Sequence, residues 1–302
     1  MKDFVIVTDT GCDLGSDIRK KLNIEHIPMV VSNNGKEIII DLDWKPFSPK
    51  EFYDMMRKGQ RFKTAQVNVA DYIRTFEPYI KNDIGVLSLV TSSGLSGSYN
   101  CCRLAREELL KKYPKATIFA VDALRSSLGQ GILCIHAANM KKEGKSIKEI
   151  AKWVEDNRLH VHQAGTVEDL TYLKRAGRVT GMAALMGGIL KIKPLIISDA
   201  KGKNVSVTKV KGRKASLREC IRYVQENITN ANAQTIYIVH GDCSEDEIEE
   251  LKKGIKEAVN CKDFYINYVG PIVGSSVGPG MFGIYFFGKK VEYDVEAGNT
   301  KL

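Results

Sequence analysis

The sequence lacks several features that would place the chain in a common functional class. No apolar run reaches the roughly 18 residues of a membrane-spanning helix, and residues 1–4 lead straight into a strand-like pattern, so we expect no signal peptide. There is no C-x-x-C pair and no glycine-rich nucleotide loop carrying its lysine. These absences argue against a membrane protein, a structural zinc site and a nucleotide-binding domain.

The cysteines do not suggest a pattern of disulfide pairing. The chain has seven cysteines, an odd number, and two of them, Cys101 and Cys102, are adjacent. Their spacing is not typical of a metal site or of a disulfide framework. We therefore expect reduced, mostly buried thiols and a cytoplasmic protein.

Acidic residues are outnumbered: 36 Asp and Glu stand against 45 Lys and Arg, which gives a net charge of +9. Such a charge can attract nucleic acid, a lipid surface or an acidic protein. The basic residues are spread along the chain, as in Lys111-Lys112 and Lys252-Lys253, on the predicted solvent faces of helices. We expect no nucleic-acid partner, while transient contact with an anionic membrane surface remains compatible with the charge.

The order of secondary-structure patterns predicts an α/β protein. In the first half, β-rich runs alternate with helical patterns; the clearest strands are residues 4–9, 83–90 and 116–122, and the clearest helices are 99–112 and 128–142. This alternation predicts a mostly parallel sheet with helices on both faces. The pattern changes near residue 158, so we expect two domains, residues 1–158 and 159–302.

The strongest local signal is the segment T-S-S-G-L-S-G-S at residues 91–98, between a predicted buried strand and a predicted helix. Its hydroxyl groups, its backbone N–H groups and the helix dipole would all favour a negative charge. The segment therefore predicts a site for a carboxylate or a phosphate. A well-capped helix preceded by a flexible turn fits the same spacing equally well.

Two weaker signals come from other loops. The glycine-rich segment 270–280 is typical either of close backbone approach to a ligand or of a wide turn between the last two strands. Thr64, in the segment 64–66, could add a hydroxyl to the anion site, although an ordinary loop before a helix is the simpler interpretation. No metal or cofactor is predicted, because Asp9 and Asp13 have no cluster of His, Asp or Glu beside them.

Taken in order, these segments resemble the DegV family, whose members include the fatty-acid-binding subunit of bacterial fatty acid kinase. The resemblance covers nearly the whole chain. The family motifs and their counterparts are D-S-x-x-D-L at residues 9–14, T-S-Q at 64–66, S-S-G-L-S-G-T-Y at 92–99, V-D-S with S-x-G-x-G at 121–131, L-x-x-L-x-K-G-G-R-I at 170–179, N-I-K-P at 191–194, and G-x-x-x-G-x-H-x-G-P-G at 270–280.

The resemblance implies an N-terminal parallel-sheet domain, a C-terminal mixed-sheet domain, and one C16–C18 fatty acid in a tunnel between them. It implies that the chain is not itself an enzyme, and that it presents the acyl carboxylate to the catalytic subunit of a separate ATP-dependent kinase. It also implies a set of ligand-binding residues around the carboxylate: Thr64, Ser93, Gly94, Ser96, Gly97, Ser276 and Arg178. Arg178 could instead form a pair at the protein surface or at the interface with the partner.

The chain departs from the family pattern at three positions. Ser276 stands where the family has a histidine, Thr10 where it has a serine, and Ala65 replaces the central serine of T-S-Q. A serine donates a hydrogen bond without carrying charge, so Ser276 puts the handling of the carboxylate, and its phosphorylation, in question. The alternative function is an enzyme acting on an acyl or phosphorylated small molecule, with Ser93 or Ser96 as the nucleophile.

Overall fold

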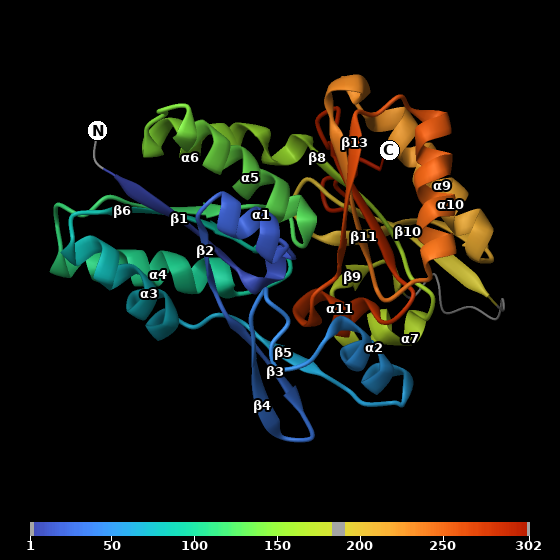
Figure 1. Cartoon of the computed structure of the whole chain (residues 1–302), viewed down its shortest axis with the longest axis horizontal. Coiled ribbons are helices and arrows are strands. Elements are labelled where there is room, and N and C mark those ends of the chain that lie inside the picture. Colours follow the sequence, from blue (N-terminus) through green and yellow to red (C-terminus); the bar gives the residue numbers. More distant parts are fainter. Residues whose placement is uncertain (1–2, 183–190, 301–302) are drawn as a thin grey trace. The chain divides into compact units, whose positions relative to one another are not determined.

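The computed structural model describes residues 3–182 and 191–300. The chain forms two compact units (Figure 1). The first unit comprises residues 1–46 and 62–158, and the second comprises residues 47–61 and 159–302. The chain therefore passes from one unit to the other three times.

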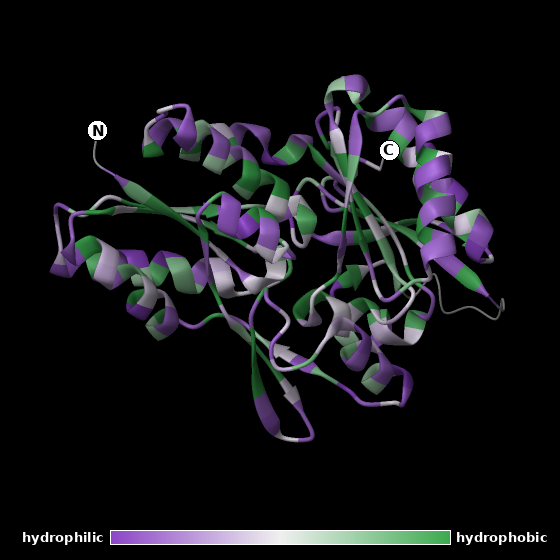
Figure 2. Cartoon of the chain, in the orientation of Figure 1, coloured by the Kyte–Doolittle hydropathy of each residue, from purple (hydrophilic) through white to green (hydrophobic). Residues whose placement is uncertain are grey.

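A parallel sheet forms the centre of the first unit. Its strands run in the order β2 (Ile24–Ile27), β1 (Phe4–Asp9), β6 (Gly85–Val90) and β7 (Ile118–Asp122), and all neighbours are parallel. Helices α3 (Val69–Lys81) and α4 (Ser98–Lys112) cover one face, while α5 (Leu128–Lys142) and α6 (Ile147–Asn157) cover the other (Figure 1). Because both faces are covered, β1 and β6 are almost continuously apolar (Figure 2). The predicted parallel sheet is confirmed.

A second, smaller sheet belongs to the first unit. It contains β4 (Lys36–Ile40), β3 (Met29–Asn33) and β5 (Lys63–Ala65), all antiparallel. The short helices η1 (Thr10–Cys12) and α1 (Ser16–Lys21) follow β1. The sequence predicted a loop where β5 lies. This strand is only three residues long, and it forms by pairing with β3, which lies more than thirty residues earlier in the chain.

The second unit is built on a seven-stranded mixed sheet. Its strands run in the order β13 (Asp263–Tyr268), β12 (Thr235–His240), β14 (Phe282–Phe287), β8 (Val161–Thr166), β10 (Ile192–Ser198), β11 (Asn204–Lys211) and β9 (Val179–Thr180). Only the β12–β13 and β11–β9 pairs are parallel, so the predicted mixed sheet is confirmed. Helix α9 (Arg213–Asn227) packs on this sheet and α10 (Glu245–Ala258) packs on α9. Both helices expose hydrophilic residues and bury an apolar stripe (Figure 2).

Helix α2 (Pro49–Arg57) belongs to the second unit, although the predicted boundary at residue 158 put it in the first domain. The Tyr53 hydroxyl donates to the carbonyl of Val269 at 2.7 Å. The Arg57 guanidinium lies 2.5 Å from the carboxylate of Asp242. These partners come from the far end of the chain, and no local pattern in the sequence points to them.

The remaining elements of the second unit are short. They are η2 (Arg158–His160, beginning at the last residue of the first unit), α7 (Leu170–Ala176), η3 (Ala231–Ala233) and α11 (Pro271–Val277). Six of the seven cysteines are buried as free thiols and Cys243 is half-buried, in agreement with the expected thiols. Among the described helices, none is both long enough and apolar enough to cross a membrane.

Candidate anion site at the end of the parallel sheet

The carboxylate of Asp9 joins the ends of two neighbouring strands of the first unit. Its Oδ1 accepts from the backbone N–H of Gly11 at 2.9 Å, and its Oδ2 accepts from the backbone N–H of Thr91 at 2.9 Å. Asp9 ends β1 and Thr91 directly follows β6. Because Asp9 is 1% exposed, water does not compete for these bonds, and the start of the 91–98 segment is held firmly.

The hydrogen bonds around Thr91 favour a protonated Asp9. The Thr91 hydroxyl lies 2.6 Å from Asp9 Oδ1 and 2.8 Å from Gln130 Oε1. Gln130 uses its amide nitrogen on Thr8 and Leu89, so its oxygen must accept from Thr91. A single hydroxyl proton cannot serve two acceptors, whereas a protonated Asp9 would donate to Thr91. Burial raises the pKa of Asp9, against the opposing effect of the bonds from Thr91.

Four consecutive backbone N–H groups of the serine-rich segment, from Ser93 to Ser96, are bonded within the protein. Ser93 N donates to Asp122 Oδ1 at 3.1 Å and Gly94 N donates to Ser92 Oγ at 3.1 Å. The N–H groups of Leu95 and Ser96 both donate to the Ser92 carbonyl at 3.0 Å. The segment folds back on itself in tight turns, and these four N–H groups are used within it or on Asp122. Binding of an anion by the segment stays a prediction, with the exposed hydroxyl of Ser93 as a donor.

The structure brings the Thr64 segment against the serine-rich segment. A Cβ placed on Gly97 would lie 2.1 Å from Gln66 Oε1, so the Gln66 side chain lies directly over Gly97. The backbone N–H of Val67 donates to Ser98 Oγ at 3.1 Å. Thr64 itself lies on β5 and is exposed, as is Ser93. Two exposed hydroxyl groups are thus presented from adjacent segments of the first unit.

Asp122, at the end of β7, also positions the serine-rich segment. Its Oδ1 accepts from Ser93 N and, at 3.0 Å, from Leu124 N. Sequence reasoning treated Asp9 and Asp122 as motif positions and did not assign them this role. The available signal was an acidic residue at the end of each of two parallel strands, followed by small or hydroxyl-bearing residues.

Ser276 and Arg178 lie in the second unit. Ser276 is half-buried on α11, a helix where the sequence suggested a wide turn. Arg178 is exposed, and its Nη1 donates to the carbonyl of Ala176 at 2.6 Å. Helices α7 and α11 contact each other, so both residues belong to one region of that unit. Their contact with a ligand stays a prediction.

His240, at the end of β12, has the surroundings of a structural histidine. It is 4% exposed, its Nδ1 accepts from the backbone N–H of Cys243 at 3.3 Å, and its ring centroid lies 4.3 Å from that of Tyr268. Burial lowers the pKa of His240 from 6.5 to about 4. Within residues 3–182 and 191–300, no group of three or more His, Cys, Asp or Glu could hold a metal ion.

The lowered pKa of His240 predicts a loss of stability in acid. The unfolded chain binds this proton near pH 6.5, while the folded protein resists it until about pH 4. The free energy of unfolding should therefore fall as pH drops from 6.5 to 4, by up to about 3 kcal/mol from this residue. Urea unfolding of wild type and His240→Gln across this range measures the effect. An unfolding free energy that depends on pH identically in both proteins would contradict this role of His240.

Comparison with known proteins places these features in a family. Residues 3–289 match the family model described as "Uncharacterised protein, DegV family". A DegV domain-containing protein of Clostridium perfringens is 42% identical over 292 residues, covering 97% of this chain and 100% of the relative.

Two solved structures resemble the whole chain. One is a DegV lipid-binding protein of Thermotoga maritima, with a TM-score of 0.83 and 26% identity, covering 97% of this chain and 100% of the other. The second is a DegV family protein of Thermus thermophilus described by its fatty acid binding, with a TM-score of 0.83, 26% identity, and coverage of 95% and 100%. By its sequence and its fold, this chain belongs to the DegV family.

Proposed function

We propose that this chain binds one long-chain fatty acid and that the Thr64 and Ser93 hydroxyl groups bind its carboxylate. The observation that carries the proposal is the pair of exposed hydroxyls, presented from adjacent segments whose own backbone is already hydrogen-bonded. The two similar DegV proteins, named for lipid binding and for fatty acid binding, support it.

The energetics of such binding depend mainly on the acyl chain. Each buried methylene contributes about 0.8 kcal/mol, so a C16 chain offers more than about 10 kcal/mol before the costs of association. The two hydroxyls then chiefly fix the orientation of the head group. A tunnel between the two domains for the acyl chain stays a prediction, as do the contacts of Gly94, Ser96, Gly97, Ser276 and Arg178.

We further propose that the bound carboxylate is presented to a separate fatty acid kinase in the bacterial cytoplasm. A carboxylate oxygen would attack the γ-phosphorus of ATP held by the kinase, forming an acyl phosphate and releasing ADP. Neutral hydroxyl donors suit this step because they orient the carboxylate without neutralising its charge. The net charge of +9 supports transient contact with anionic membranes, where lipid could be exchanged. Liposome sedimentation with and without anionic lipid tests that contact.

Replacing Thr64 and Ser93 together with alanine should reduce fatty acid retention. Both side chains are exposed, so the double substitution should leave the stability of the protein nearly unchanged. The reduced retention should therefore reflect the missing hydrogen bonds to the carboxylate. The protein, expressed in bacteria and purified without detergent, is extracted with organic solvent, and the extract is measured by mass spectrometry. We expect near-stoichiometric C16 or C18 acid from wild type and much less from the double variant. Thr229→Ala, at an exposed threonine of the second unit, is the matched control.

Three outcomes would contradict the proposal. Retention unchanged in the double variant would remove the head-group site. An empty wild-type extract, with no uptake of added palmitate or oleate, would remove the lipid function. Stoichiometric labelling of Ser93 by a serine-reactive probe would favour the enzyme instead. For the kinase step, a hydroxylamine-trapped acyl product should appear only when the kinase and ATP are both present.

A further inference from the structure

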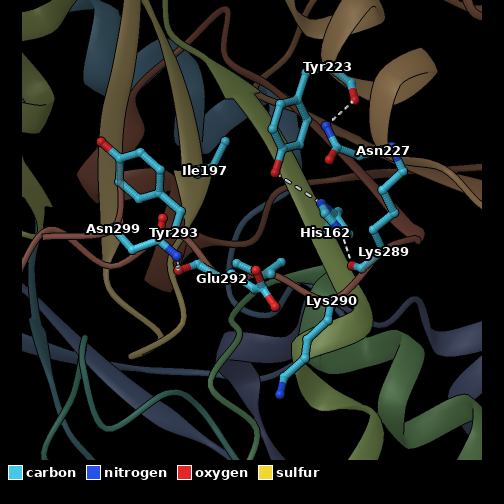
Figure 3. Close-up of a pocket in the computed structure, with 10 residues that line it drawn as sticks. His162, Ile197, Tyr223, Asn227, Lys289, Lys290, Glu292, Tyr293 and Asn299 are labelled. Atoms are coloured by element: carbon cyan, nitrogen blue, oxygen red, sulfur yellow. Dashed lines mark hydrogen bonds between the residues drawn. The ribbon is translucent and has the colours of Figure 1, made fainter. Parts of the chain in front are cut away.

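A cavity of about 550 Å³ lies inside the second unit, lined in part by the segment that follows β14 (Figure 3). This volume is typical of small-molecule sites. Its walls come from β8, β10 and α9, and from residues 289–293 and 299. None of these elements carries a residue of the proposed fatty acid site, so the cavity needs its own explanation.

A buried imidazole forms the floor of the cavity. His162 is 3% exposed, and its Nε2 lies 2.6 Å from the carbonyl oxygen of Lys289. A carbonyl can only accept, so Nε2 carries the proton. His162 Nδ1 lies 3.0 Å from the Tyr223 hydroxyl. The Tyr223 hydroxyl is thus hydrogen-bonded within the protein.

Two side-chain amides of the cavity each use one N–H donor on the protein. Asn227 Nδ2 donates to the carbonyl of Tyr223 at 2.9 Å, which turns its oxygen toward the side where His162 lies (Figure 3). Asn299 Nδ2 donates to the carbonyl of Glu292 at 2.9 Å. Each amide nitrogen thus uses one of its two N–H donors on a backbone carbonyl, and each amide oxygen can act only as an acceptor.

Three charged residues, Lys289, Lys290 and Glu292, also line the cavity. The Lys289 ammonium donates to the carbonyl of Glu226 at 2.8 Å, and the Lys290 side chain extends away from the rings of Tyr223 and Tyr293 (Figure 3). Glu292 supplies the one carboxylate among the residues that line the cavity. A cation near it would meet this carboxylate, the amide oxygens and two aromatic rings.

We infer that this cavity binds a small organic cation, an ammonium group attached to an apolar or aromatic portion. The ammonium lies between the Glu292 carboxylate and the Asn227 amide oxygen, where it gains charge-assisted hydrogen bonds and attraction to the faces of the tyrosine rings. The apolar portion packs against Ile197 and Val291, which line the same cavity. This site is independent of the proposed fatty acid function.

Calorimetric titration with a matched pair of probes tests the inference. Phenethylammonium and 2-phenylethylsulfonate share the ring and linker but carry opposite charges, and neither has a carboxylate that could enter the fatty acid site. We expect phenethylammonium to bind wild type with a dissociation constant below about 1 mM, and 2-phenylethylsulfonate to give no heat. Glu292→Gln and Tyr293→Ala should each weaken phenethylammonium about tenfold or more.

Glu296→Gln is the matched control. Glu296 is an exposed carboxylate of the same segment, but it pairs with Lys203 at 2.5 Å and does not line the cavity. It should leave phenethylammonium binding unchanged, and fatty acid content should be the same in all these proteins. No heat with phenethylammonium, preferential binding of the sulfonate, or equal affinity in wild type and Glu292→Gln would each overturn the inference.

Discussion

Replacing Gly278 with alanine is expected to lower the free energy of unfolding by about 3 kcal/mol or more. Gly278 follows α11 with φ 78° and ψ 176°, a region of backbone conformation that is essentially restricted to glycine. A Cβ there would also lie 2.3 Å from Cδ2 of the Tyr172 ring. That ring cannot move freely, because its hydroxyl donates to the carbonyl of Met56 at 3.2 Å. The free-energy cost of the backbone strain and that of the collision with Tyr172 therefore add.

Two further variants separate the causes, each measured by urea unfolding. Gly35→Ala has the same kind of positive φ, 79°, but no atom lies within 4 Å of its added Cβ, so it should cost only about 1 to 2 kcal/mol. In a Tyr172→Ala background the collision at Gly278 disappears and only the backbone strain remains, so Gly278→Ala should cost less there. Equal losses at Gly278 and Gly35 would show that the contact with Tyr172 is unimportant.

Replacing Asp9 with alanine should destabilise the protein by about 3 kcal/mol and reduce fatty acid retention. The change leaves the buried N–H groups of Gly11 and Thr91 without their acceptor, and each unpaired buried group costs about 1 to 3 kcal/mol. It also releases the start of the segment that carries Ser93. Asp9→Asn should reduce stability less than Asp9→Ala, because the asparagine oxygen can still accept a hydrogen bond from a backbone N–H. The asparagine amide nitrogen can also donate to the Thr91 hydroxyl.

The pH dependence of Asp9→Asn tests the protonation state. Burial raises the pKa of Asp9 above its ordinary value of 3.8, so the folded protein holds the proton more tightly than the unfolded chain. The contribution of Asp9 to stability is therefore largest below pH 3.8 and declines as pH rises through its folded pKa. Asp9→Asn cannot lose this proton, so its stability relative to wild type should increase with pH. A constant difference would mean that the pKa of Asp9 is the same in the folded protein and in the unfolded chain.

The sequence predicted well the elements that depend on local patterns. The strands β1 and β6 and the helices α4 and α5 lie within two residues of the predicted ranges. Helix α11 was missed because its glycines suggest a turn. It forms with Pro271 in its first turn, and it contains Gly274 where an added Cβ would lie 2.7 Å from the Tyr53 hydroxyl. The residue that requires a glycine at position 274, Tyr53, is more than two hundred residues away in the sequence, so the local pattern could not indicate it.

The position of the 91–98 segment was predicted from the sequence, but the use of its backbone donors was not. The 91–98 segment does follow a buried strand and precede a helix, as the pattern indicated. Its backbone donors, however, are used by Ser92 and by Asp122, and the latter lies 29 residues from Ser93. The cavity around His162 gave no sequence signal, because its walls come from separate strands, one helix and the last segment of the chain.

The placement of α2 has a consequence for how the protein is made. Tyr53 and its acceptor, Val269, are separated by 216 residues, so a ribosome completes α2 long before it completes the surface that α2 covers. Until then the apolar side chains of Phe52, Tyr53 and Met56, all buried in the finished protein, stay exposed to water. Such a nascent chain is prone to aggregation and is a natural client for a chaperone. A fragment cut at residue 158 would keep that defect permanently.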